Sequence, residues 1–162
     1  MKISARGEYA ILALLELAIQ YKENKPVTVQ LISQKQSVPE NFLLHILLEL
    51  QRHGLVISKR GSQGGYVLAT SPEKITLGKI LRIFDGSPLT VRCLEPLGIL
   101  LSCENEIKCG LKEVLFELQE KILKLTEEIT FADIVQRLNK KNQKLKIKIQ
   151  NIKRKEKVLT GK

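Results

Sequence analysis

Residues 54–69 constrain the fold more than any other segment, because two short runs of β-forming residues flank a basic, glycine-rich gap. β-branched and aromatic residues favour strands, and a gap rich in glycine favours reversal of the chain. The segment therefore predicts an antiparallel hairpin. The strand-forming residues are Leu55, Val56 and Ile57 before the gap and Tyr66, Val67 and Leu68 after it.

The gap between the two runs carries positive charge at its tip. Lys59 and Arg60 precede Gly61, Gly64 and Gly65, and glycine permits positive φ and close approach to another backbone. A loop of this kind can lie against phosphates and insert an arginine into a narrow groove of DNA. The same residues also fit an ordinary surface hairpin with a charged turn, so the hairpin alone leaves both interpretations open.

The sequence before the hairpin predicts three helices. Residues 4–21 repeat apolar side chains at helical spacing, and Thr28 is a suitable N-cap for a short second helix. Residues 40–53 predict a third helix, for which Gly54 supplies the C-cap. The fold class is therefore mainly α with a small β-hairpin, in the order of a winged helix-turn-helix domain, whose last helix enters the major groove.

The third predicted helix has a core face and a face left near DNA or solvent. The expected core residues are Leu43, Ile46, Leu47 and Leu50. The residues left near DNA or solvent are Glu40, Asn41, Leu44, His45 and Gln51. The candidate DNA-binding residues are Asn41 and His45 on this helix and Lys59, Arg60, Ser62, Gln63 and Gly64 in the hairpin.

The positive charge is concentrated at the C-terminal end. The net charge is +10, and residues 139–162 hold ten Lys and Arg against one Glu, whereas residues 1–138 hold 17 Lys and Arg against 16 Asp and Glu. Because like charges repel and few apolar residues can pack, we expect residues 139–162 to be largely disordered. The tail fits a non-specific nucleic-acid arm that acts through counterion release, and it fits a solvated extension equally well.

No apolar run reaches the roughly 20 residues that a membrane-spanning helix needs, and the N-terminus lacks a secretory pattern. We therefore expect no membrane partner and a soluble compartment that contains DNA, either the cytoplasm or the stroma or matrix of an organelle. The sequence also lacks a nucleophile with a base and acid, and it lacks a phosphate-binding glycine loop, so we do not expect an enzyme.

Three cysteines form the second group of candidate site residues. Cys93, Cys103 and Cys109 have the spacing C-x9-C-x5-C and are all the cysteines of the chain. An odd number argues against a disulfide framework, and structural zinc usually needs a closely spaced pair and four ligands. An iron-sulfur cluster tolerates wider spacing but needs a fourth ligand from elsewhere. Three incidental small buried residues remain an alternative.

Four segments together resemble a known family. These are the start at residues 1–10, the hairpin tip at 60–66, the segment at 75–80 and the three-cysteine loop. They are similar to the winged-helix regulators that include the iron-sulfur cluster regulator, the nitric-oxide-sensing repressor and the cysteine-metabolism repressor, called the Rrf-two family. The resemblance covers roughly residues 1–138.

The resemblance implies a homodimeric repressor that binds a partly palindromic double-stranded DNA operator, with Arg60 in the minor groove. Residues 111–129 then form a long dimerisation helix, although its apolar stripe could also pack on its own domain. That stripe contains Val114, Leu115, Leu118, Ile122 and Leu125. The expected parts are a winged helix-turn-helix domain at residues 1–86, a cysteine-containing sensor loop at 87–110, dimerisation and C-terminal helices at 111–138, and the basic tail at 139–162.

In the cluster-binding branch of that family, three cysteines hold a 2Fe-2S or 4Fe-4S cluster and a fourth residue completes its ligands. Glu8 of the partner subunit matches one such position, whereas Lys112 stands where some members have a histidine. Leu44 stands where some members carry a base-contacting glutamate. The implied signal is redox state, iron or nitric oxide. Two alternatives stay open: a cluster-free regulator that answers a small molecule or thiol signal, and a non-specific RNA-binding protein.

Overall fold

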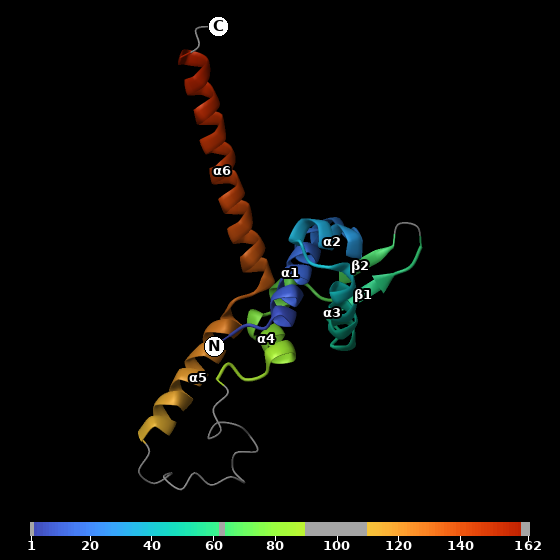
Figure 1. Cartoon of the computed structure of the whole chain (residues 1–162), viewed down its shortest axis with the longest axis vertical. Helices are drawn as coiled ribbons and strands as arrows, with labels where there is room; N and C mark the ends of the chain where they lie inside the picture. The colour runs from blue at the N-terminus through green and yellow to red at the C-terminus, as the bar shows by residue number, and fades with distance from the viewer. Residues whose placement is uncertain (1, 62–63, 90–109, 160–162) are drawn as a thin grey trace.

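The computed structural model describes residues 2–61, 64–89 and 110–159. The chain is mainly helical with one two-stranded antiparallel hairpin, as predicted (Figure 1). Its elements are α1 (Ala5–Ile19), the short 3-10 helix η1 (Tyr21–Glu23), α2 (Val29–Gln36), α3 (Glu40–Arg52), β1 (Val56–Lys59), β2 (Gly65–Leu68), the 3-10 helix η2 (Pro72–Lys74), α4 (Leu77–Asp85), α5 (Gly110–Glu128) and α6 (Phe131–Leu159).

Side-chain caps fix where the first helices begin. The hydroxyl of Ser4 accepts a hydrogen bond of 3.1 Å from the Gly7 N–H and so starts α1. The Thr28 hydroxyl accepts one of 3.2 Å from the Leu31 N–H at the start of α2, which confirms Thr28 as an N-cap. Each of these caps satisfies a backbone donor that the first turn of a helix leaves unpaired.

Gly54 ends α3 in a left-handed conformation. Its φ is +67°, and its N–H donates a hydrogen bond of 3.0 Å to the Gln51 carbonyl. The Leu55 N–H donates one of 2.9 Å to the Leu50 carbonyl, which completes a Schellman motif. The predicted C-cap is therefore confirmed, and the chain turns directly from α3 into β1.

The hydrophobic core is built around α1. This helix contacts α2, α3, α4, α6, β2 and η1. Small buried side chains at Ala10, Ala13 and Ala18 let those neighbours approach it closely. At Gly7 an added Cβ would lie 2.5 Å from Oδ2 of Asp85 at the end of α4, so the carboxylate would have to move to admit a side chain.

The junction between α5 and α6 is tied to the start of α4. The Leu77 N–H donates to the Ile129 carbonyl at 2.8 Å, and the Phe131 N–H donates to the Ile75 carbonyl at 2.9 Å. The Phe131 side chain is fully buried, and it is one of the largest side chains in the core. These bonds and this burial fix the first turn of α6 to the body of the protein.

A reciprocal cap strengthens the start of α6. The N–H of Thr130 donates to the Asp133 carboxylate at 3.0 Å, and the Asp133 N–H donates to the Thr130 hydroxyl at 3.1 Å. The Thr130 hydroxyl also donates to the same carboxylate at 2.6 Å. These bonds from Thr130 hold the pKa of Asp133 below its ordinary value.

The basic tail differs from the sequence prediction. Residues 139–159 continue α6, which projects from the body in a different direction from the hairpin (Figure 1), where the sequence predicts disorder. The physical reason is that a helix whose first turn is already anchored gains one hydrogen bond per added residue without a new nucleation step. On this helix Leu145 and Ile149 lie on one side and Ile147 lies on the opposite side, and all three are exposed.

Within the described part of the chain, none of the helices combines the length and the apolar character that crossing a bilayer requires.

Replacing Phe131 by Ala should lower the free energy of unfolding by about 3 to 5 kcal/mol, because it leaves a cavity at the anchor of α6. Urea unfolding at a fixed protein concentration measures this change. Ile147→Ala is the matched control, since Ile147 is exposed on the same helix, and it should change stability by less than about 0.5 kcal/mol. Equal losses in the two variants would contradict the anchoring role of Phe131.

Candidate nucleic-acid interface

α3 turns one face to the core and the opposite face to solvent. The four residues predicted for the core, Leu43, Ile46, Leu47 and Leu50, are all buried. Glu40, Phe42 and Gln51 are exposed at the margins of the solvent face, and one exposed row at helical spacing consists of Asn41, Leu44, His45, Leu48 and Arg52. This row includes the candidate residues Asn41 and His45. It also adds Leu48 and Arg52, which the sequence analysis missed although their spacing from Asn41 could have indicated them.

The hairpin is held at a fixed position relative to the helices. Its strands pair from Val56 opposite Leu68 to Lys59 opposite Gly65. β2 is also bonded on its other side: the Val27 N–H donates to the Tyr66 carbonyl and the Tyr66 N–H donates to the Val27 carbonyl, both at 2.9 Å.

Gly65 makes this second pairing possible. Its φ is +152°, and an added Cβ would lie 2.6 Å from the Val27 carbonyl oxygen. A side chain at this position would therefore push β2 away from the segment that leads into α2. The orientation of the hairpin depends on this glycine.

The tip of the hairpin is narrow and basic. The Gly64 N–H donates to the Gly61 carbonyl at 2.9 Å, and a Cβ on Gly64 would lie 2.5 Å from the Lys59 carbonyl oxygen. Lys59 and Arg60 are both exposed, and Nζ of Lys59 lies 3.4 Å from Oδ1 of Asn24. The candidates Ser62 and Gln63 lie outside the described residues.

A buried carboxylate fixes α2 against α1. The Glu16 side chain is only 6% exposed, and it accepts 2.9 Å and 2.7 Å hydrogen bonds from Lys35 and Gln36 at the end of α2. Burying a charge is unfavourable unless it is paired, so these two partners hold the end of α2 in place. α2 in turn packs against α3, and the exposed row of α3 is thereby positioned.

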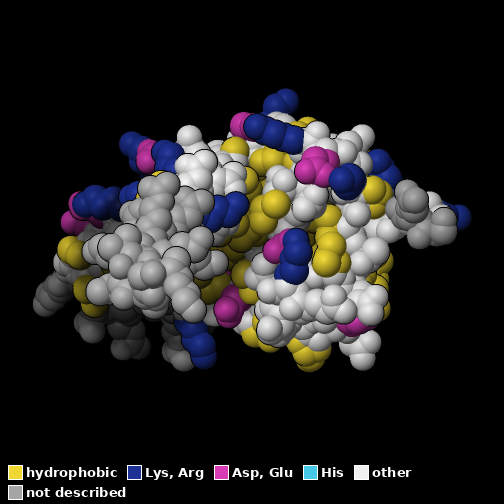
Figure 2. All heavy atoms as spheres, turned by 90° about the horizontal axis from the view of Figure 1, so that it is seen from above, with side chains coloured by type: hydrophobic (Ala, Val, Ile, Leu, Met, Phe, Trp, Pro, Cys, Tyr) yellow, Lys and Arg dark blue, Asp and Glu magenta, His cyan; other side chains and the backbone are white. Residues whose placement is uncertain are grey.

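The winged-helix body carries no large basic field on the face seen from the side of α6. Figure 2 shows Lys and Arg side chains interspersed with acidic ones there, with apolar side chains between them. This agrees with the nearly equal numbers of basic and acidic residues before position 139.

A groove of about 530 Å³ runs between the start of α1 and the exposed side of α3. Arg6 and Tyr9 line it from α1, and Phe42, His45 and Arg52 line it from α3. The Tyr9 and Phe42 rings meet edge to face with centroids 6.3 Å apart. Basic and apolar groups therefore lie together along the exposed row of α3.

The candidate metal ligands are only partly described. Cys93, Cys103 and Cys109 lie outside the described residues, and Glu8 is exposed on the first turns of α1. In the ranges that the structure does describe, no three His, Cys, Asp or Glu side chains come together as a metal site. His53 instead lies 3.6 Å from Glu49 on α3.

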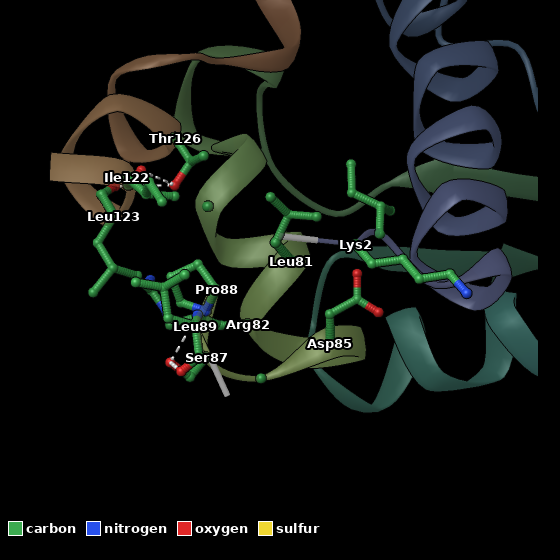
Figure 3. A pocket seen from close by; sticks show the side chains of 13 residues that line it. Lys2, Leu81, Arg82, Asp85, Ser87, Pro88, Leu89, Ile122, Leu123 and Thr126 are labelled. Carbon is green, nitrogen blue, oxygen red and sulfur yellow. Dashed lines mark hydrogen bonds between the residues drawn. The ribbon is translucent and has the colours of Figure 1, made fainter. Parts of the chain in front are cut away.

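The cysteine-containing segment connects α4 to α5, and residues of both helices line a second cavity. This cavity, of about 440 Å³, lies between the N-terminal segment, α4 and α5, with Lys2 on one side and Thr126 on the other (Figure 3). Asp85 at the end of α4 accepts a 3.3 Å hydrogen bond from the Ser4 N–H. Arg82 of α4 forms an ion pair with Glu127 of α5. The start of α1, the end of α4 and α5 are thus linked around a cavity that Ser87, Pro88 and Leu89 also line.

Comparison with known proteins identifies the family. A family model described as an iron-dependent transcriptional regulator matches residues 3–137. The chain belongs to the Rrf2 family. An Rrf2-like HTH-type transcriptional regulator of Rhodobacter capsulatus is 32% identical over 140 residues, which cover 82% of this chain and 91% of the relative.

Two solved Rrf2 structures have the same fold. CymR, the global cysteine regulator of B. subtilis, has a TM-score of 0.71 and 30% identity, over 84% of this chain and 97% of that chain. IscR of T. potens has a TM-score of 0.68 and 30% identity, over 85% of this chain and 88% of that chain. The predicted family and winged-helix fold are confirmed, and the chain is a DNA-binding transcription regulator and not an enzyme.

Arg60→Ala should weaken operator binding by about 1 to 3 kcal/mol at fixed salt, because the exposed arginine at the hairpin tip would no longer enter a groove. Fluorescence anisotropy with a selected operator measures the affinity. Lys74→Ala is the control, as Lys74 is an exposed cation on η2, which packs against α6. Unchanged affinity of the Arg60 variant would remove this residue from the interface.

Proposed function

We propose that this Rrf2 regulator is a homodimeric repressor that senses redox state, iron or nitric oxide through an iron-sulfur cluster. The observation that carries the DNA-binding part is the juxtaposition of the exposed α3 row with a hairpin bonded to the segment before α2. Asn41 and His45 face the major groove in this proposal. Lys59, Arg60, Ser62, Gln63 and Gly64 follow the neighbouring backbone and minor groove.

The exposed stripe of α5 supports a homodimer. Val114 and Leu125 are each 60% exposed and Leu118 is 45% exposed, whereas Leu115 and Ile122 are half-buried. A helix gains little from apolar side chains left in water, so a second copy is the natural cover for this stripe. Two-fold symmetry then supplies one DNA-binding unit for each of two half-sites that lie about one helical turn of DNA apart.

Leu118→Lys should convert the dimer into a monomer, because the interface would bury an unpaired charge. Analytical ultracentrifugation measures the mass, and operator affinity should fall in parallel. Glu120→Lys is the control, since Glu120 lies on the exposed polar side of α5. A Leu118→Lys protein that still sediments as a dimer would exclude the α5 stripe as the interface.

The donor set fits an iron-sulfur cluster chemically. Three thiolates from Cys93, Cys103 and Cys109 are the ligands that such clusters prefer, and a carboxylate from Glu8 of the partner subunit would complete the set. The bound cluster would supply sensitivity to oxidants, nitric oxide and iron supply. The family description, an iron-dependent regulator, supports this part of the proposal.

Contacts at the end of α4, where the cysteine-containing segment begins, lead through α1 to the proposed DNA-binding helix α3. The segment follows α4, whose last residue Asp85 bonds the first turn of α1 through Ser4 and contacts Gly7. A change in the cysteine segment would then bias the placement of α1 and of the α3 packed on it. The second candidate is a cluster-free regulator that answers a small molecule or thiol signal, which similarity to CymR favours.

Protein purified without oxygen should show broad visible absorption with stoichiometric iron and sulfide, and Cys93→Ala should lose all three because one thiolate ligand is missing. Ser102→Ala, in the same segment, is the control and should keep them. Glu8→Ala should alter the absorption while leaving the dimer intact. A colourless, iron-free wild-type dimer that binds a specific operator would instead establish the cluster-free alternative.

A further inference from the structure

Two leucines occupy the centre of the surface that α3 turns to solvent. Leu44 is 42% exposed and Leu48 is 48% exposed. They lie one helical turn apart, within the row that also contains Asn41, His45 and Arg52. Neither belongs to the hydrophobic core, which the opposite side of α3 fills, and Leu48 also lines the groove between α1 and α3.

Their chemistry limits what they can recognise in a major groove. A leucine side chain neither donates nor accepts hydrogen bonds, so it cannot pair with the polar edges of guanine, cytosine or adenine. The apolar group that the major groove offers is the 5-methyl group of thymine. A leucine that faces the groove therefore selects for thymine by burying that methyl group.

The spacing of the two leucines sets the spacing of the bases. Four residues of helix span about 6 Å, and one base step in B-DNA rises about 3.4 Å. Leu44 and Leu48 can therefore reach bases about one or two steps apart. Asn41 and His45 in the same row, and Arg60 in the hairpin, provide the polar contacts on either side.

We propose that Leu44 and Leu48 are specificity-determining residues that read the 5-methyl groups of two nearby thymines in each operator half-site. This inference rests on the proposed binding of DNA by α3. Phe42, although 58% exposed, has a different position, because its ring packs at the edge of Tyr9 in the groove between α1 and α3.

The test begins with an operator selected from random DNA by the wild-type protein. Each thymine is then replaced singly by deoxyuridine, which removes only the methyl group and keeps every hydrogen-bonding group. Affinity at fixed salt should fall about three- to fivefold at two positions in each half-site, the effect of losing one buried methyl group. Other thymines should show no change.

The variants assign each methyl group to a side chain. Leu44→Ala should bind the thymine and deoxyuridine operators equally at one of these positions, and Leu48→Ala should do so at the other. Both variants should fold, because the substituted side chains are exposed. Phe42→Ala is the matched control and should keep both methyl effects.

Two results would overturn the inference while leaving DNA binding intact: a selected operator indifferent to every methyl removal, or methyl effects that persist in both leucine variants. A change of oligomeric state in the leucine variants would assign this surface to a second copy and overturn it as well. Failure to select any specific operator would overturn the proposed role of α3 together with the inference.

Discussion

The enclosure of α1 is the constraint on which the rest of the structure depends. Six other elements contact this one helix, and they reach it because its buried positions are glycine, alanine and leucine, apart from the paired carboxylate of Glu16. Gly7 is the extreme case, since the Asp85 carboxylate occupies the space that a side chain would need. Helix α3, helix α4 and the anchored start of α6 are all positioned by contact with α1.

The proposed DNA-binding surface depends on two sets of hydrogen bonds between segments that are distant in sequence. The backbone pairing of Val27 with Tyr66 orients the hairpin, and the bonds from Lys35 and Gln36 to Glu16 orient α2 beneath α3. Together they hold the hairpin tip and the α3 row in one arrangement. A preorganised surface of this kind loses less conformational entropy on binding than a flexible one.

A set of polar contacts joins the start of α1, the α4 region and α5. Asp85 bonds the start of α1, and Glu127 of α5 bonds both Thr76 and Arg82 of the α4 region. The same α5 carries the exposed stripe proposed for the dimer. Under the proposed function, a change in the cysteine segment alters the placement of the two DNA-binding units through these contacts. Under the further inference, Leu44 and Leu48 select which bases are bound.

Local patterns in the sequence determined helix α3, its core face, the caps at Thr28 and Gly54, and the basic hairpin, because each depends on residues a few positions apart. Only the tertiary structure decided how these parts are placed. Val27 pairs with a strand almost 40 residues away, and Gly7 meets the end of a helix almost 80 residues away, which no local period encodes. The basic tail is the clearest difference, since its composition predicts disorder, whereas burial of Phe131 anchors a helix that then propagates through it.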